Sequence, residues 1–230
     1  MAANSTGNSP RARTSGGFTL VLLLIVAALW WSGQLQPRDS SSPATRTPPT
    51  TAPAAKTGTF ETHRNCTLVA ARNNDGDSFM VRLPDGRERE LRLYYVDTPE
   101  SAFKRYAGGE TNHERIRQQA AELGGITPEQ AVEIGKQAKA YTLALLEARP
   151  FTIHTIWDSP FQDNRFHAFV AIEQPGGTRW LHELLLERGL VRLKTKPAPL
   201  PDGTPVETHR RHLKDLEAQA KRARAGAWGR

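Results

Sequence analysis

Polar and apolar residues alternate along the chain from position 66 onward, as they do in strands with one buried face. Residues 66–70, 79–83 and 91–95 form three such runs. Residues 84–87, Pro-Asp-Gly-Arg, are a hairpin turn signal between the second and third runs. The pattern therefore predicts three consecutive antiparallel strands at the start of a folded domain.

The apolar spacing changes to a helical period further along the chain. Residues 127–130, Thr-Pro-Glu-Gln, form a capping box with proline at the first helical position, which predicts a helix start. Apolar positions continue at helical spacing to about Ala148. The strand pattern then returns over residues 151–157 and 166–173.

Two further helices are predicted after these strands, over residues 180–188 and 207–224. The first is short and amphipathic, and Gly189 favours its end at that point. Three strands, a helix, two strands and terminal helices indicate an α+β fold over residues 60–230. We expect a five-stranded OB-type β-barrel with three or more helices, one of them inserted between the third and fourth strands.

The first sixty residues carry no such pattern and begin with a membrane-type sequence. Residues 18–33 are largely apolar and approach the ~17–25 residues that span a bilayer, which predicts a transmembrane or signal-anchor helix. Trp30 and Trp31 stand where a cleaved signal peptide has small residues, so we expect an uncleaved anchor, and secretion only if cleavage occurs. Residues 1–17 carry positive charge and are expected to stay cytoplasmic.

Residues 34–59 are mostly Pro, Ser, Thr, Ala and Gln, a composition that predicts a flexible linker between the anchor and the domain. The membrane is thus an expected partner through the N-terminal helix. The folded domain is expected on the extracytoplasmic side, either periplasmic or extracellular. We expect a monomer with no protein partner.

Charge narrows the range of binding partners. The chain has 31 basic and 24 acidic residues, and its net charge of +7 favours nucleic acid or an anionic membrane surface. Residues 192–230 hold ten Lys or Arg against four acids, so positive potential is concentrated at the C-terminal end. Cys66 is the only cysteine, which excludes an intrachain disulfide and a cysteine-clustered zinc site.

Two acidic segments lie at the ends of the predicted strands. Residues 75–77, Asp-Gly-Asp, precede the second strand, and residues 97–100, Asp-Thr-Pro-Glu, follow the third. Each segment alone is typical of a turn or a helix entrance. The predicted meander brings Asp77 and Asp97 to neighbouring strand ends, where two carboxylates can face one cation. Oxygen ligands of this kind suit Ca²⁺ or Mg²⁺.

Two arginines accompany these carboxylates. Arg92 lies on the third strand and Arg165 begins the fifth, and each alone is an ordinary surface arginine. Together, two guanidinium groups can hold one phosphate. Phosphodiester hydrolysis must offset a developing negative charge and supply a nucleophile. A dication, two arginines and a carboxylate such as Glu100 suit that reaction.

The order and spacing of these motifs resemble the staphylococcal nuclease, or thermonuclease, family. Its signature is an Asp-Gly-Asp-Ser/Thr turn, an Arg on strand three, a Val-Asp-Thr-Pro-Glu segment and a later Arg. In this chain these are residues 75–78, Arg92, residues 96–100 and Arg165. Similarity continues through residues 184–190 and 213–228, so it spans nearly all of residues 66–230.

The resemblance implies a role for each residue of the signature. Asp77 and Asp97 would ligate Ca²⁺, helped by the main-chain carbonyl of Thr98. Glu100 would position or deprotonate the attacking water, and the two arginines would hold the scissile phosphate. The implied activity is a calcium-dependent phosphodiesterase that hydrolyses DNA and RNA with low sequence specificity and leaves 3′-phosphate ends.

The chain departs from the family pattern at three places. Residues 162–164, Gln-Asp-Asn, stand where the family often has Lys-Tyr-Gly, which predicts weaker binding of a terminal phosphate. Residues 191–196 lack the family's tyrosines, which leaves base stacking open. Residues 101–126 form a long connection with Arg115 and Arg117 available near the site. A packing role is favoured for it over that of a substrate lid.

Two other functions stay open. A non-catalytic OB-fold nucleic-acid-binding protein is one, because such barrels often bind single strands without cutting them. An adhesion or envelope protein that holds calcium for stability is the other. The full set of signature residues argues against the first, and the second leaves both arginines without a task.

None of the seven histidines is assigned to a site. His209 and His212 are expected on a solvated helix face and His182 on a helix surface, with no carboxylate pattern of a metalloprotease nearby. His154 and His167 are expected to pair across neighbouring strands.

Overall fold

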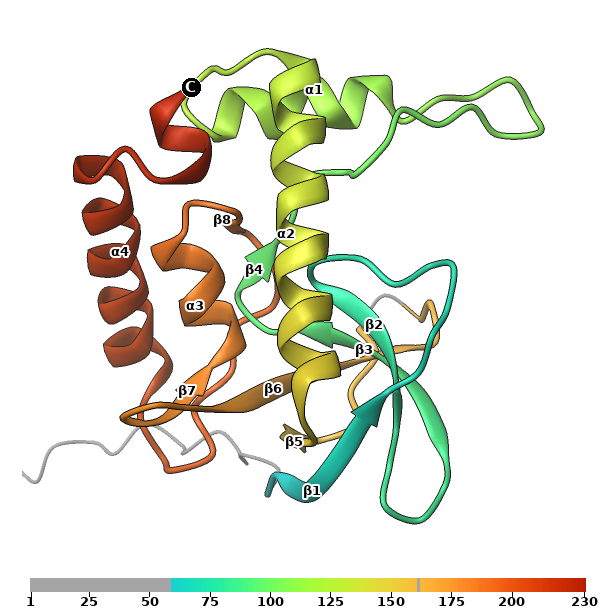
Figure 1. Ribbon diagram of the computed structural model, residues 1–230, viewed down its shortest axis with the longest axis vertical. Coiled ribbons are helices and arrows are strands. Elements are labelled where there is room, and N and C mark those ends of the chain that lie inside the picture. The colour runs from blue at the N-terminus through green and yellow to red at the C-terminus, as the bar shows by residue number, and fades with distance from the viewer. Residues whose placement is uncertain (1–58, 161) are drawn as a thin grey trace, which may run out of the picture. The chain divides into compact units, whose positions relative to one another are not determined.

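The computed structural model describes residues 59–160 and 162–230 (Figure 1). The predicted cytoplasmic segment, anchor helix and nearly all of the linker fall on residues 1–58 and so lie outside the described residues. No helix in the described part of the chain is both long enough and apolar enough to cross a membrane.

Five strands close into a mixed β-barrel. β1 (Glu61–Leu68), β2 (Ser78–Arg82) and β3 (Glu88–Leu93) pair antiparallel in sequence order, and β1 also pairs with β5 (Phe151–Thr155). β5 pairs with β6 (Arg165–Gln174), and the parallel pairing of β6 with β3 closes the ring. The barrel, with the four α-helices of the described residues, gives an α+β fold consistent with the OB type.

The predicted meander of three strands is confirmed, although its first strand begins before residue 66. The residues of β1 that precede Cys66 are mostly exposed, so the sequence shows no alternation there. They are held by pairing with β5, in which Glu61 lies opposite Thr155. A bulge between His63 and Cys66 separates this pairing from the buried part of the strand.

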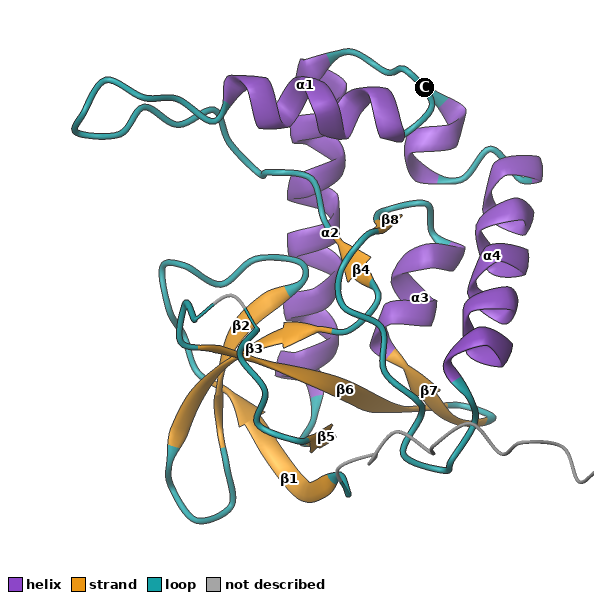
Figure 2. Ribbon diagram, turned by 180° about the vertical axis from the view of Figure 1, so that it is seen from behind, coloured by secondary structure: helices purple, strands orange, loops and turns teal. Residues whose placement is uncertain are grey.

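The capping box predicted the start of the longest helix correctly. α2 (Pro128–Ala148) begins after Thr127, whose hydroxyl accepts from the Gln130 N–H at 3.2 Å. The Gln130 side-chain oxygen in turn accepts from the Thr127 N–H at 2.9 Å. Figures 1 and 2 show α2 running from α1 at its N-terminal end to the barrel at its C-terminal end.

The 101–126 connection contains a helix that the sequence pattern did not predict. α1 (His113–Glu122) packs on α2 through Ile116 and Ala120, which meet Ala131 and Val132. The α1 part of this connection therefore has a packing role. The loop between β4 and α1 projects from the body of the domain in both views (Figures 1 and 2).

The remaining elements extend the barrel on one side. α3 (Leu181–Glu187) and α4 (Val206–Arg222) confirm the two helices predicted over residues 180–188 and 207–224. The two helices pack on each other. β7 (Gly177–Trp180) lengthens the sheet beside β6, and β4 (Val96–Asp97) pairs with β8 (Arg192–Leu193). The β4 and β8 pairing joins the acidic segment after β3 to the chain after α3. A final 3₁₀ turn spans Gly226–Gly229.

Three histidine predictions are wrong. His182 and His209 were expected on helix surfaces, but they are 0% and 2% exposed, because α3 and α4 pack on each other through these side chains. His154 does not lie opposite His167, since the strand register places it opposite Phe169.

Candidate functional site

A polar cavity of about 190 Å³ gathers most of the residues predicted for the site. Five of the six predicted site residues line this cavity, namely Asp77, Arg92, Thr98, Glu100 and Arg165. The sixth, Asp97, does not. The other lining residues are Asn73, Asp75, Ser78, Glu90, Lys104 and Arg115. The fold therefore brings together segments from both sides of the meander, from the 101–126 connection and from β6.

Residues 75–77 reach the cavity because α2 supports their turn. Gly76 packs so closely on this helix that an added Cβ would lie 2.9 Å from the Cβ of Ala138. The Thr142 hydroxyl, also on α2, donates to the Gly76 carbonyl at 2.8 Å. Close packing therefore requires glycine here, and it fixes the position of the neighbouring Asp77.

The second acidic segment rests on the same helix. An added Cβ at Gly135 would lie 2.5 Å from the carbonyl oxygens of both Pro99 and Glu100. Because Gly135 has no side chain, the backbone of residues 97–100 can pack directly against α2. One helix thus sets the spacing between the two acidic segments.

Asp77 is buried, and its carboxylate has only long contacts. Its Oδ2 accepts from the Thr98 N–H at 3.2 Å and lies 3.5 Å from Arg92 Nη2, and the Ser78 hydroxyl is 3.4 Å from Oδ1. Burial raises the pKa of Asp77 to about 6, against the opposing effect of Arg92. A buried carboxylate with poorly compensated charge is a suitable ligand for a cation.

Asp97 lies behind the cavity wall, where arginines hold it. Its Oδ1 accepts from Arg92 Nη2 at 2.7 Å, and its Oδ2 accepts from Arg192 at 2.7 and 3.0 Å. The Arg92 guanidinium thus stands between the two carboxylates that were expected to face one cation. In this structure Asp77 borders the cavity and Asp97 does not.

Arg192 is a site residue that the sequence analysis did not single out. The pairing of β8 with β4 places it directly opposite Asp97, and it is 9% exposed. Its other amine group bonds Glu122 at the end of α1. From the sequence, Arg192 was only one of the basic residues near the C-terminal end, because a two-residue strand has too few positions to show alternation.

Glu100 faces the cavity and is held by three donors. Lys104 Nζ and Asn112 Nδ2 reach its Oε2 at 3.3 and 3.2 Å, and Arg115 Nε lies 3.2 Å from Oε1. Gln119 accepts from the Glu100 N–H at 3.0 Å. All four residues belong to the 101–126 connection, so this connection orients the carboxylate.

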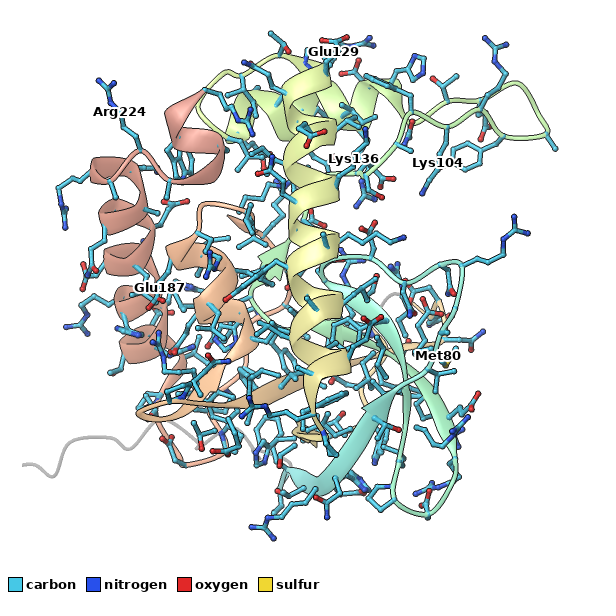
Figure 3. All side chains as sticks on the ribbon, in the orientation of Figure 1. Met80, Lys104, Glu129, Lys136, Glu187 and Arg224 are labelled. Carbon is cyan, nitrogen blue, oxygen red and sulfur yellow. The ribbon has the colours of Figure 1, made fainter. Side chains whose placement is uncertain are left out.

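The same connection adds positive charge to the cavity. The side chains of Lys104 and Arg115 line it and are 48% and 51% exposed, so both can reach a bound anion. Figure 3 shows Lys104 on the segment before α1, pointing toward the barrel. Arg115 was expected near the site, whereas Lys104 was not.

Arg165 lines the cavity but is paired with a close neighbour. Its Nε donates to Asp163 Oδ2 at 2.9 Å, and its Nη2 donates to the same oxygen. Burial opposes the charged guanidinium, but the Asp163 carboxylate outweighs that effect and raises the pKa of Arg165. Residues 162–164 differ from the pattern of the thermonuclease family. Because of this difference, the Asp163 carboxylate is paired with Arg165, the arginine that was expected to hold phosphate.

The formal charges of the cavity cancel, because four acidic and four basic side chains line it. A dication bound among them would leave a net positive charge, which suits an anionic ligand. The Asp77 carboxylate and the Thr98 carbonyl are oxygen ligands of the kind that calcium takes. The Thr98 carbonyl also accepts from Gln119 Nε2 at 3.2 Å, so a cation bound there would share this oxygen with Gln119.

Compared with protein-family models and with curated proteins, the chain matches none of them. The resemblance to the thermonuclease family consequently rests on its motifs. The fold and cavity define an α+β barrel protein with a polar pocket of mixed charge.

Proposed function

We propose that the domain is a calcium-dependent nuclease that hydrolyses DNA and RNA with low sequence specificity. The observation that carries the proposal is the meeting of Arg92, Arg165, Glu100 and Asp77 in one cavity, although they come from distant parts of the sequence. These are the residue types and positions of the thermonuclease signature. A dication, two arginines and a carboxylate together meet the demands of phosphodiester hydrolysis.

Each residue has a task in this proposal. Asp77 and the Thr98 carbonyl bind calcium, which when bound stabilises negative charge on the phosphate. Arg92 exchanges Asp97 for the phosphate. This exchange makes Oδ1 of Asp97 available as a further oxygen ligand, while Oδ2 stays bound to Arg192. Glu100, oriented by the 101–126 connection, holds the attacking water or takes its proton.

Low sequence specificity follows because the proposed contacts are made to phosphate groups and not to bases. The cavity offers guanidinium and ammonium groups that recognise phosphate oxygens, which are the same at every nucleotide. Arg165 is the second phosphate ligand, once the substrate displaces Asp163. The products would carry 3′-phosphate ends, as the resemblance implies.

We further propose a location for this activity. Residues 18–33 anchor the chain in a membrane, residues 34–59 act as a flexible tether, and the nuclease domain acts as a monomer on the extracytoplasmic side.

A non-catalytic nucleic-acid-binding protein is the second candidate. It is favoured by one observation, that Arg92 and Arg165 are both paired with acids and are not free for a reacting phosphate. Such a protein would bind single strands by its positive groups without cutting them.

One experiment separates the two functions. The purified full chain is incubated with single-stranded DNA and RNA, with calcium or with excess chelator, beside an Arg92→Ala, Glu100→Ala double variant. Calcium-dependent cleavage that the double variant loses is the expected result. Intact substrate at high enzyme concentration, with retained binding of nucleic acid, would select the binding protein instead.

A further inference from the structure

Four side chains that commonly bind transition metals meet where α3 packs on α4. His182 and Glu183 lie at the start of α3, and His209 and His212 lie one turn apart on α4. The Nε2 atoms of His182 and His209 are 2.8 Å apart, and His212 Nε2 is 3.3 Å from Glu183 Oε1. None of these residues lines the cavity described above.

The group is compact and mostly closed to solvent. The ligand atoms of His182, Glu183 and His209 all lie within 4.8 Å of one another, as in no other group of three such residues in the described chain. These residues are 0%, 8% and 2% exposed, whereas the side chain of His212 is 51% exposed. The group therefore has a buried floor and one open side, through which an ion can enter. Aromatic rings pack around His182, namely those of Tyr95, Phe169 and Trp180.

A hydrogen bond between two imidazoles explains only part of this arrangement. It satisfies one nitrogen of His182 and one of His209. It does not require a mostly buried carboxylate, that of Glu183, beside the pair. Burial of polar groups costs free energy that an apolar helix interface would avoid. A metal ion that binds several of these groups at once would offset the free-energy cost of burying them.

We propose that His182, Glu183 and His209 bind a zinc ion. His212 lies outside this group of three, but its Nε2 is 3.3 Å from Glu183 Oε1, and its exposed side chain would turn inward to become the fourth ligand. Imidazole nitrogens with one carboxylate oxygen suit zinc, whereas calcium takes oxygen ligands. Tetrahedral zinc with bonds of ~2.0–2.1 Å holds two nitrogens about 3.3 Å apart, so the histidine pair must open by about 0.5 Å. Both histidines of the pair are buried, so this opening requires a small shift of their side chains within the interface between α3 and α4.

The role of this ion is structural. Four protein ligands leave no open position for a substrate, and the ion would fasten α3 to α4 beside the barrel. Metal that binds the folded chain and not the unfolded chain raises the temperature of unfolding. The site is thus distinct from the proposed calcium site in both chemistry and task.

Metal binding is measured on the full chain after treatment with chelator and its removal. Calorimetry with zinc should give one bound ion, and cobalt at the same site should give the visible absorption of a tetrahedral centre. Zinc should raise the unfolding temperature.

Because His212 is exposed, His212→Ala should fold normally and bind zinc about tenfold or more weakly. His209→Gln should lose binding, and His113→Ala, an exposed histidine of α1, should bind as the natural chain does.

Two results would overturn the proposal. One is a folded natural chain that binds no zinc. The other is zinc affinity unchanged by His212→Ala, a result that decides the matter even if His209→Gln does not fold. Since the readout is metal binding and stability, neither result depends on whether the chain cleaves nucleic acid.

Discussion

The Arg92 guanidinium donates to the Asp97 carboxylate at 2.7 Å, and both side chains are buried. The same Nη2 atom lies 3.5 Å from Asp77 Oδ2. An arginine between two acids offsets one of their two negative charges and competes with a cation for the same oxygens. The proposed function therefore requires Arg92 to exchange a carboxylate for phosphate when metal and substrate bind.

Replacing Arg92 with glutamine removes this competition. We expect Arg92→Gln to bind calcium at least as tightly as the natural chain, while cleavage falls about 10²–10³-fold because a contact to developing charge is lost. Calorimetry and initial rates measure the two effects. Arg82→Gln, at an exposed position of β2, is the control. Loss of calcium binding in the Arg92 variant would contradict this view of the pair.

The pair formed by Asp163 and Arg165 predicts that Asp163 restrains the phosphate ligand. Asp163→Asn keeps the shape of the side chain and removes its charge. We expect the KM for an oligonucleotide to fall about two- to fivefold, in keeping with a partly exposed ion pair. Asp85→Asn, which breaks the pair with Arg87 in the β2 to β3 turn, is the matched control and should leave KM unchanged. If Asp163→Asn has the same KM as the natural chain, Asp163 does not hold Arg165 away from the phosphate.

Gly135 is predicted to be essential for the geometry of the site. An added Cβ would meet the carbonyl oxygens of Pro99 and Glu100 at 2.5 Å, so the segment must move away from α2. We expect Gly135→Ala to lower the free energy of unfolding by about 1–3 kcal/mol, the usual cost of overpacking. Denaturant unfolding checks this, with Gly108→Ala as control, since nothing lies within 4 Å of its added Cβ. Equal stability of the two variants would refute the close-packing argument.

His167 predicts a pH dependence of stability. Burial lowers the pKa of His167 from 6.5 to about 4. The Asp158 carboxylate opposes this shift, while Arg92 and Lys196 add to it. The unfolded chain takes up this proton first as pH falls, so the free energy of unfolding should decrease between about pH 6.5 and 4. His167→Gln should make that decrease smaller. Unfolding curves across this pH range measure both slopes, and equal slopes would contradict the assignment.

The barrel could be predicted because its signals are local. Alternation over residues 79–83 and 91–95, the turn at residues 84–87 and the capping box at Thr127 each act within a few residues of sequence. The order of elements then limited the fold to few choices. The exposed start of β1, the polar helix α1 and the short strands β4, β7 and β8 lacked such a signal.

The site could be predicted only in part, because several of its contacts join residues far apart in the sequence. The motif residues that line the cavity were found from their spacing. Arg192 and Gln119 were not, since their contacts to Asp97 depend on the β4 to β8 pairing and on the packing of α1. The exclusion of Asp97 from the cavity has the same origin. Burial of His182 and His209 likewise depends on the packing of α3 on α4, which the sequence of either helix alone does not reveal.

Under the proposed function, Glu100 in the cavity takes part in calcium-dependent phosphodiester hydrolysis. The most direct test follows the shortening of an end-labelled single-stranded oligonucleotide by the full chain, its Glu100→Gln variant and the control Glu129→Gln, whose side chain lies at the exposed start of α2 (Figure 3). We predict cleavage that requires calcium, is about 10²-fold or more slower in Glu100→Gln, and is unchanged in Glu129→Gln. Equal rates in the three proteins, or no cleavage by a natural chain that still binds the oligonucleotide, would contradict the claim.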